Sequence, residues 1–413
     1  MNMEEVLRLI VPDQEEKEEA LKKYGEVSDY IEKRFGRETI LVGSVAKDTF
    51  LKGDKDLDIF VYFNIDEKRE EMEKEALLIG KSVFEHFGNE YQVEYAEHPY
   101  VSGIVDGYDI EIVPCYKIKN AHNIISAVDR TPFHLSFVKD HLRDCQKDDV
   151  RLLKKFLKAQ KMYGADSKVN GFSGYLCELL IIHYGSFEGL ARSAINWEVG
   201  ETIEFLRPVN VFKDPLIIID PVDPNRNVAS PVSLDTYSRF VLECKRYFDT
   251  KDEGMFAGPE MGYEPIEGGR LIVIQVDMDV LEDIFYSQCR KFLATIKRSF
   301  KSEGFTLYRS GIFSKGLVLD IETGDLPTIK KHMGPRIGNV ENMQRFLSKN
   351  RCVFAEGGHL FSFRERRYND VIDVINDIIK DKVGMGNHLK KANLKILSKE
   401  SAYLSIKDEI IYY

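Results

Sequence analysis

The chain has 413 residues, of which 43% are hydrophobic and 31% charged, and its formal net charge at pH 7 is −10. This composition is typical of a globular protein with two or three domains, and no apolar run approaches the roughly 20 residues of a membrane-spanning helix. The six cysteines lie far apart without a Cys-x-x-Cys pair, the pattern of reduced thiols, so we expect a cytoplasmic protein that does not contact membranes.

The first 130 residues are predicted to form an α/β domain with a mixed sheet. A helix is expected over 3–35, with a break near Pro12. Strands are then expected at 39–43, 57–63, 91–96, 99–105 and 108–113, with a helix at 67–86 between the second and the third. Alternation of short strands with helices is the pattern on which this prediction rests.

Two aspartates open the second of these strands. Gly43 and Ser44 follow one apolar run, and Asp56 and Asp58 begin the next about a dozen residues later. Because successive side chains of a strand alternate between its faces, both carboxylates point the same way, roughly 7 Å apart. Two carboxylates on a rigid strand opposite a Gly-Ser turn can hold a divalent metal beside a triphosphate, which indicates nucleotidyl transfer.

A third carboxylate is expected from a neighbouring strand. Asp109 and Glu111 alternate with isoleucines and therefore lie on one face of the strand at 108–113. Either of them alone would be better explained as part of a solvated face. Repeated aspartates disfavour strands, however, so the pair at 56 and 58 needs a compensating cation, and two Mg²⁺ ions require only a few carboxylates beside phosphate oxygens.

The middle of the chain is predicted to be a helical domain over residues 131–255. Apolar residues recur with a period of 3.6 between 133 and 197, and a strand is expected at 216–219. Residues 251–269 are rich in Gly and Pro, which is typical of a linker.

The tail, residues 270–413, is predicted to be a ferredoxin-like or RRM-like α+β domain. The expected order is strand 271–276, helix 279–302, strands 305–312 and 316–321, a helix around 340–349, and strands 352–356 and 359–365. This domain carries 24 Lys and Arg against 18 Asp and Glu, whereas the rest of the chain is acidic. A net positive domain is suited to binding a polyanion, although an excess of this size is common by itself.

These motifs resemble the nucleotidyltransferase superfamily that includes DNA polymerase beta, eukaryotic poly(A) polymerases and oligoadenylate synthases. The resemblance rests on Gly43-Ser44, on Asp56-Leu57-Asp58, and on the later run of an acidic residue, Ile, Val and Pro at 111–114. Residues 129–134, 171–180 and 220–228 make the chain similar, more narrowly, to the archaeal class I CCA-adding enzymes. The similarity extends over the whole chain.

The resemblance implies a nucleotidyltransferase palm, a helical central domain that binds nucleotide and tRNA, and a tail that binds tRNA. It implies an enzyme that adds C, C and A to the 3′ end of tRNA without a nucleic acid template, using CTP, ATP and Mg²⁺ and releasing pyrophosphate. It also suggests a homodimer. The alternatives are a poly(A) polymerase or an oligoadenylate synthase-like enzyme, and a catalytically dead RNA-binding homologue.

By the same resemblance, Asp56, Asp58 and Glu111 would bind the metal and act in catalysis. The family usually has Asp where this chain has Glu111, and Asp109 on the same face is the alternative third carboxylate. The residues implied in nucleotide binding are Ser44, Lys47, Thr131, His134, Lys154, Tyr163 and Arg226.

The resemblance implies a contact for each of them. Ser44, Lys47, Lys154 and Tyr163 would touch the triphosphate, Thr131 and His134 the incoming nucleotide, and Arg226 would pair with the edge of C or A. Without the family motifs, each would more often be an ordinary turn or surface residue. Basic residues expected to bind tRNA in the tail are Arg290, Lys291, Lys297, Arg298, Arg364 and Arg366.

Overall fold

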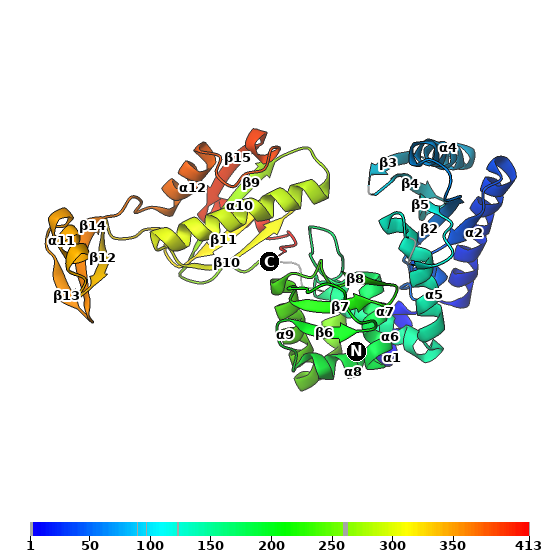
Figure 1. Ribbon diagram of the computed structural model, residues 1–413, viewed down its shortest axis with the longest axis horizontal. Coiled ribbons are helices and arrows are strands. Elements are labelled where there is room, and N and C mark those ends of the chain that lie inside the picture. Colours follow the sequence, from blue (N-terminus) through cyan, green and yellow to red (C-terminus); the bar gives the residue numbers. More distant parts are fainter. Residues whose placement is uncertain (1–2, 89, 96, 122–123, 259–262, 413) are drawn as a thin grey trace. The chain divides into compact units, whose positions relative to one another are not determined.

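The structure is a computed structural model that describes residues 3–412 apart from 89, 96, 122–123 and 259–262 (Figure 1). The chain divides into two compact units, residues 1–259 and 260–413. Within the described residues, no helix is both long and apolar enough to cross a bilayer.

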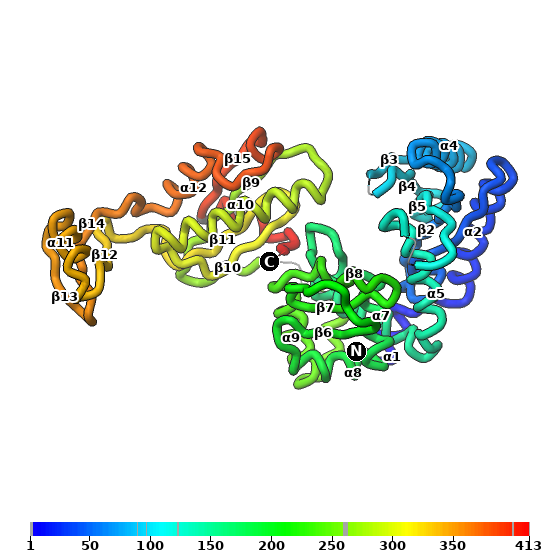
Figure 2. Tube along the Cα trace, viewed as in Figure 1, coloured from blue at the N-terminus to red at the C-terminus, as the bar shows by residue number. Residues whose placement is uncertain are grey.

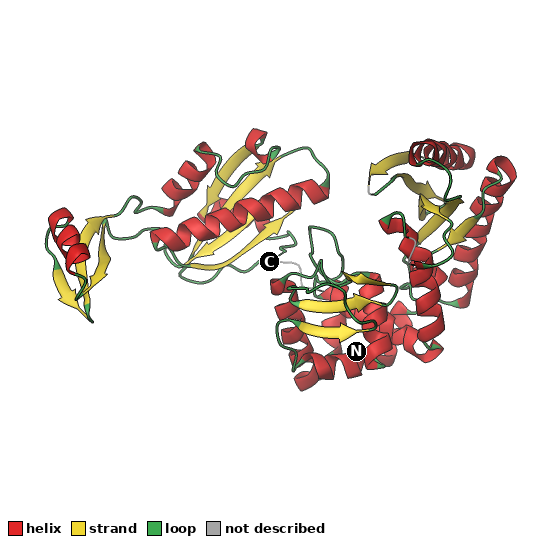
Figure 3. Ribbon diagram, viewed as in Figure 1, coloured by secondary structure: helices red, strands yellow, loops and turns green. Residues whose placement is uncertain are grey.

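A five-stranded sheet organises the first part of unit 1 (Figure 3). Its strands are β1 (Thr39–Leu41), β2 (Asp56–Phe63), β3 (Tyr91–Tyr95), β4 (Pro99–Val105) and β5 (Tyr108–Tyr116). Their order is β1-β2-β5-β4-β3, with β2 and β5 parallel and all other neighbours antiparallel. The expected mixed sheet is confirmed. The first strand ends earlier than predicted because a short helix, α3 (Gly43–Ala46), follows it, and the expected strand end at residue 96 lies outside the described residues.

Helices cover one face of this sheet. They are α2 (Gln14–Phe35), which Asp13 caps by accepting from the N–H of Glu16, and α4 (Arg69–Phe87). Leu57 and Ile59 of β2 and Ile110 of β5 pack against these helices in one apolar core. The residues between them therefore point to the opposite face, which the helices leave open.

The rest of unit 1 is mainly helical and has its own core, which α1 (Met3–Ile10) joins. Its helices are α5 (Thr131–His141), α6 (Lys147–Ala159), α7 (Gly174–Tyr184), α8 (Phe187–Ala194) and α9 (Leu234–Thr250). A small sheet of β6 (Glu201–Glu204), β7 (Leu216–Asp220) and β8 (Asp223–Asn227) completes it. The strand expected at 216–219 is β7, and β8, which the sequence did not predict, pairs with it after a two-residue turn.

Unit 2 is built on a ferredoxin-like scaffold. Its elements are β9 (Arg270–Asp277), α10 (Glu282–Glu303), β10 (Leu307–Phe313), β11 (Gly316–Ile321), α12 (Val371–Lys380) and β15 (Asn393–Ser398). The four strands form an antiparallel sheet in the order β10-β11-β9-β15, as a split β-α-β unit requires. Helices α10 and α12 share one core with this sheet, and α13 (Lys399–Ile406) packs on its other face.

A second, smaller sheet is inserted between β11 and α12. It consists of β12 (Ile329–Arg336), β14 (His359–Glu365) and β13 (Phe354–Glu356), in that order, with α11 (Val340–Lys349) beside β12. Figure 2 follows the chain out of β11, through this sheet and back into α12. The strands expected at 352–356 and 359–365 therefore form a separate sheet instead of extending the scaffold.

Candidate active site

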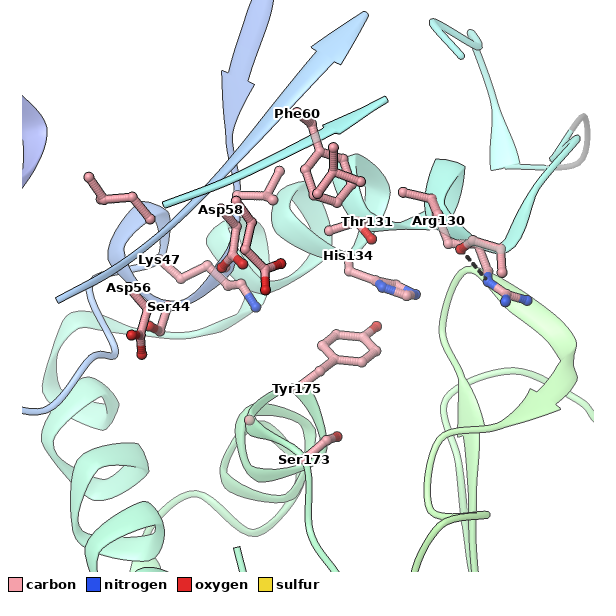
Figure 4. A pocket seen from close by; sticks show the side chains of 18 of the residues that line it. Ser44, Lys47, Asp56, Asp58, Phe60, Arg130, Thr131, His134, Ser173 and Tyr175 are labelled. Atoms are coloured by element: carbon pink, nitrogen blue, oxygen red, sulfur yellow. Dashed lines mark hydrogen bonds between the residues drawn. The ribbon is translucent and has the colours of Figure 1, made fainter. Parts of the chain in front are cut away.

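A cavity of about 910 Å³ lies in unit 1 between the open face of the five-stranded sheet and helices α5, α6 and α7 (Figure 4). All ten residues for which the sequence predicts a metal, catalytic or nucleotide-binding role line it: Ser44, Lys47, Asp56, Asp58, Glu111, Thr131, His134, Lys154, Tyr163 and Arg226. Asp109 also lines the cavity, so the structure leaves both candidates for the third carboxylate beside it.

The carboxylates of the sheet form two cross-strand pairs. In the parallel register of β2 and β5, Asp56 lies opposite Asp109, and Asp58 lies opposite Glu111. We call these four side chains the carboxylate face. Like charges directly opposite each other in a sheet are destabilising, so this face is not explained by the stability of the fold.

Burial and mutual repulsion make this face a poor place for negative charge alone. Burial raises the pKa of Asp58, and the charge of Asp56 adds to the rise. Burial also raises the pKa of Glu111 to about 7, with Asp58 and Asp109 as further causes. A cation at this position would offset both effects.

The chemistry of the carboxylate face fits a divalent cation. No three His, Cys, Asp or Glu side chains among the described residues converge into a preformed metal cage. Mg²⁺ does not require one, because it usually keeps several waters and takes one or two carboxylates together with the phosphates of a substrate. An open face of oxygen donors is therefore a suitable donor set.

Gly43 allows α3 to lie close to this face. Its φ of 69° is left-handed, and a Cβ atom added there would lie 1.8 Å from Oδ2 of Asp58. The chain also pairs with β2 at this point, where the N–H of Val42 donates to the carbonyl of Asp58 at 2.9 Å. The Gly-Ser turn and the aspartates are thus in direct contact, with Ser44 on the wall of the cavity.

A buried polar cluster joins the loop after α3 to helices α6 and α7. Nζ of Lys47 donates to Oε2 of Glu178 at 2.6 Å, and the hydroxyl of Thr49 donates to Oε1 of the same carboxylate at 2.7 Å. Nζ of Lys154 donates to the carbonyl of Thr49 at 2.9 Å. Burial lowers the pKa of Lys154, whose side chain is almost inaccessible to solvent, although Glu178 opposes the shift.

His134 and Arg226 meet at a second buried carboxylate, Asp220. Nε2 of His134 donates to Oδ2 of Asp220 at 2.9 Å, and Nη1 of Arg226 donates to the same oxygen at 2.7 Å. Figure 4 shows the ring of His134 lying against that of Tyr175, and their centroids are 4.1 Å apart. Burial lowers the pKa of His134, even though Asp220 opposes the shift.

The remaining two residues lie at element ends. Thr131 begins α5, directly after a turn in which buried Asp129 accepts from the N–H groups of Tyr116 and Ser126. Tyr163 follows α6 and forms a bridge with Phe172, and burial raises the pKa of its phenol.

Sequence reasoning did not assign roles to Glu178, Tyr175 or Asp220. Glu178 carries a signal nevertheless, because it is a charged residue in the apolar helix α7 and needs a partner when buried. Asp220 holds the turn between β7 and β8 by accepting from the N–H of Val222 at 3.0 Å. Its bonds to His134 and Arg226 join residues 86 and 6 positions away, which no local pattern reveals.

The basic residues expected to bind tRNA all lie in unit 2, four of them on α10, one on β14 and one directly after β14. Lys291, Lys297 and Arg298 are exposed on α10. Arg364, on β14, donates to Oδ1 of Asn350, whereas Arg366 is half-buried and donates to the carbonyl of Glu303 at 2.7 Å. Arg366 therefore connects the inserted sheet to the end of α10. Arg290, also on α10, is half-buried.

Three family models match successive parts of the chain. A nucleotidyltransferase domain matches residues 12–134. The second domain of tRNA nucleotidyltransferases matches 148–257, and the C-terminal domain of CCA-adding enzymes matches 268–398.

Similar proteins cover almost the same length. The CCA-adding enzyme of Methanocaldococcus jannaschii is 38% identical, over 97% of this chain and 95% of that protein. That of Methanothermobacter thermautotrophicus is 35% identical, over 93% and 90%, and that of Archaeoglobus fulgidus is 35% identical, over 89% and 86%. A solved structure of the Cid1 poly(U) polymerase is 17% identical with a TM-score of 0.49, over 61% of this chain and 96% of its own.

Proposed function

Because this chain belongs to the family of archaeal CCA-adding enzymes, we propose that the cavity of unit 1 is the site at which it extends tRNA. The enzyme is a template-independent tRNA nucleotidyltransferase that adds C, C and A to the 3′ end. In each addition, the 3′-hydroxyl oxygen of the RNA forms a bond to the α-phosphorus of CTP or ATP. The bond from that phosphorus to the bridging oxygen breaks, and pyrophosphate leaves.

The carboxylate face is the observation that carries this assignment. Nucleotidyltransferases of this family generally use divalent metal ions, and we propose Mg²⁺ here. Asp56, Asp58 and Glu111 would hold it, with Asp109 as the alternative to Glu111. When bound, Mg²⁺ neutralises the triphosphate and makes the 3′-hydroxyl a better nucleophile.

The other side chains of the cavity supply the binding contacts in this proposal. Ser44 would donate its hydroxyl to a phosphate oxygen, and the ammonium of Lys47 would attract the triphosphate. Lys154 would add to the positive potential from its buried position, and Tyr163 would bound the triphosphate. Thr131 and His134 would contact the incoming nucleotide, and Arg226 would face its base.

We also propose the expected division into domains. The catalytic domain would span 1–130, the helical central domain 131–255 and the tRNA-binding tail 270–413. The three matched models, which begin and end within about twenty residues of these limits, support this division. The tRNA contacts in the tail, the homodimer and the cytoplasmic location remain predictions.

A primer-extension assay tests the function. The purified protein is given Mg²⁺, a tRNA transcript that lacks its CCA end, and CTP or ATP alone or together. We expect two additions from CTP alone and a third only when ATP is present. Long A tails from ATP alone would instead indicate a poly(A) polymerase, and RNA binding without extension in any mixture would indicate a dead homologue.

The role of the carboxylate face is tested with Asp58→Ala. Losing a metal ligand that supplies several kcal/mol of transition-state stabilisation should lower CMP incorporation by about 10³-fold. Asp66→Ala removes an exposed carboxylate of the same domain and should leave the rate unchanged. An Asp58→Ala enzyme that incorporates CMP at the wild-type rate would refute the assignment.

A further inference from the structure

We propose that Asp220 is a positioning residue for nucleotide selection, which holds the guanidinium of Arg226 and the imidazole of His134 in one fixed arrangement toward the incoming base. This inference rests on the proposed function of the cavity. It goes further in assigning the choice of base to a buried carboxylate that does not itself line the cavity.

Asp220 is the last residue of β7, and its side chain is completely buried. Its two oxygens accept from four donors. Oδ2 accepts from Arg226 at 2.7 Å and from His134 at 2.9 Å, and Oδ1 accepts from the N–H of Val222 at 3.0 Å and from the hydroxyl of Tyr175 at 3.4 Å. An ionised carboxylate has about four acceptor positions, so all are in use and the group has no freedom to turn.

The charge of Asp220 is retained in spite of its burial. Burial alone would raise its pKa, but the hydrogen bonds that it accepts from His134, from the N–H of Val222 and from Arg226 hold the pKa below the ordinary value. A buried charge that has lost one partner is costly, and therefore Asp220 and Arg226 remain paired.

His134 is fixed on both sides. One edge donates to Asp220 through Nε2, and one ring face stacks on Tyr175 with an angle of 26° between the planes. Since burial favours the neutral imidazole, the proton lies on Nε2 and the lone pair on Nδ1. The imidazole of His134 and the guanidinium of Arg226 thus both bind the carboxylate of Asp220, and both residues line the cavity.

A fixed guanidinium can read a base because it only donates hydrogen bonds. Arg226 has five N–H groups, of which one of the two on Nη1 is directed to Asp220, and its side chain is about one-third exposed. C presents acceptors at O2 and N3, and A presents an acceptor at N1. U and G carry an N–H donor at the equivalent ring position, which would oppose a donor from the protein.

Orientation is what turns this chemistry into selectivity. A guanidinium that could rotate would find the carbonyl oxygens O2 or O4 of U, or O6 of G, and would bind those bases as well. Asp220 removes this freedom by a charge-assisted bond in a buried position, where such bonds are strongest. The positioning role therefore predicts a change in preference between bases, beyond a general loss of rate.

The hairpin of β7 and β8, which contains Asp220, also provides a matched control for the substitution of that residue. Asp223 lies opposite Asp220 in the register of β7 and β8, and its carboxylate holds Arg130 through Nη1 at 2.8 Å. Asp223→Asn therefore removes an equivalent charge and an equivalent arginine partner from the same turn, but does not touch Arg226 or His134.

The test compares single additions of C and U to a tRNA transcript that lacks its CCA end. For the wild type, Asp220→Asn and Asp223→Asn, kcat and KM are measured with CTP and with UTP, after a thermal melt shows that each is folded. We expect Asp220→Asn to lower the preference for CTP over UTP by at least about tenfold, mainly through KM. Asp223→Asn should keep the wild-type preference within about twofold.

Two results would overturn the inference. One is a folded Asp220→Asn enzyme with the wild-type preference, and the other is an equal loss of preference in Asp223→Asn. If Asp220→Asn does not fold, Asp220→Glu is tested in its place. This variant retains the charge but displaces Arg226 by the length of one methylene, so it must also lower the preference for CTP over UTP.

These outcomes are distinct from a failure of the proposed function. A wild-type enzyme that does not add C to this tRNA refutes the function itself. In that case, the shift in melting temperature that CTP or UTP causes in the protein without RNA measures the preference between the two nucleotides in all variants. Wild-type preference in the Asp220 variants would refute the positioning role in that assay as well.

Discussion

At the scale of single residues, the close contact between Gly43 and Asp58 connects a sequence motif directly to the chemistry. The backbone at residue 43 needs a positive φ, and any side chain there would occupy the place of Oδ2 of Asp58. Two independent physical reasons thus require glycine at one position. Only the second concerns the carboxylate face.

A comparison of Gly43→Ala with Gly36→Ala should separate the cost of the positive φ from the effect on Asp58. The positive φ should cost about 1–2 kcal/mol of folding free energy, and displacement of Asp58 should lower the rate of CMP incorporation by about 100-fold. Gly36→Ala is the control, because Gly36 has a φ of 65° at the end of α2 but no atom within 4 Å of its added Cβ. Urea unfolding and primer extension measure the two effects. Equal losses of activity in both variants would contradict the role of the contact.

We expect Glu111 to be needed for CMP incorporation but to lower the stability of the metal-free protein at high pH. Burial raises its pKa from an ordinary value near 4.5 to about 7, so the folded state binds this proton more tightly than the unfolded chain does. The contribution of Glu111 to stability is therefore complete below about pH 4.5 and is lost as the pH rises through 7.

Glu111→Gln should consequently stabilise the metal-free protein at pH 8, by on the order of 2 kcal/mol, and should abolish CMP incorporation. Urea unfolding at pH 5 and pH 8 in the presence of EDTA measures the first effect, and the gain should be much smaller at pH 5. Glu85→Gln, on the exposed side of α4, serves as control and should change neither quantity. A Gln variant with no gain at pH 8 would show that the carboxylate face is not strained.

The carboxylates of the cavity could be predicted from the strand pattern, and its other predicted residues from the motifs that carry the family resemblance. The strand period puts Asp56 and Asp58 on one face, and the register of β2 with β5 adds Glu111. What the sequence could not provide is the partner of each side chain. Lys47 is held by Glu178, which is 131 positions away in the chain. Such pairs are determined only when helices and sheet pack together.

At the scale of elements, α7 joins the helical part of unit 1 to the loop that follows α3. Glu178 is the connecting residue, and two lysines surround it in a region where Lys47 is 9% exposed and Lys154 only 2%. Removing the carboxylate leaves two ammonium groups buried without their counterion.

We therefore expect Glu178→Ala to lower the free energy of unfolding by about 3–5 kcal/mol. Glu188→Ala on the neighbouring helix α8 removes an exposed partner of Lys251 and should cost less than about 1 kcal/mol. Chemical denaturation of both variants at pH 7 measures the difference. Similar losses in the two proteins would mean that the buried cluster contributes no more than a surface ion pair.

Elements of unit 2 show where prediction from sequence fails. The first three strands and the long helix of the scaffold could be predicted, because β9, α10 and β11 have clear apolar periods. Helix α12 and the fourth strand, β15, were not predicted. Strand β12 was missed, since Lys330, Lys331, Gly334 and Pro335 are all unfavourable in strands. Without β12, nothing in the sequence separates β13 and β14 from the larger sheet.

At the scale of the whole molecule, the distribution of charge is more uneven than the division into domains indicates. Residues 328–367, which contain the inserted sheet, carry nine Lys and Arg against three Asp and Glu. The remainder of residues 270–413 has 15 of each. The positive excess of the tail therefore belongs entirely to the insertion, and the scaffold that supports it is neutral.

This distribution predicts that the insertion supplies most of the phosphate contacts of the tail. Replacing exposed Arg345, Lys349 and Arg351 by Ala should weaken tRNA binding by at least about tenfold at low salt and reduce its salt dependence. Replacing Lys291, Lys297 and Lys301 on α10 is the matched triple substitution. Filter binding over a range of salt concentrations compares them, and a greater loss from the α10 variant would contradict the prediction.

The two ends of the inserted sheet are joined to each other. The N–H of Arg366 donates to the carbonyl of Thr328 at 2.7 Å, and Ile329 lies opposite Glu365 in the register of β12 and β14. The chain thus leaves the scaffold and returns to it at adjacent points, so one tight turn could replace all 37 residues between them. The scaffold would keep every strand of its own sheet. In evolution, such a cassette can be gained, exchanged or lost as one unit, and lineages can change the most positively charged part of the tail without rebuilding the domain that carries it.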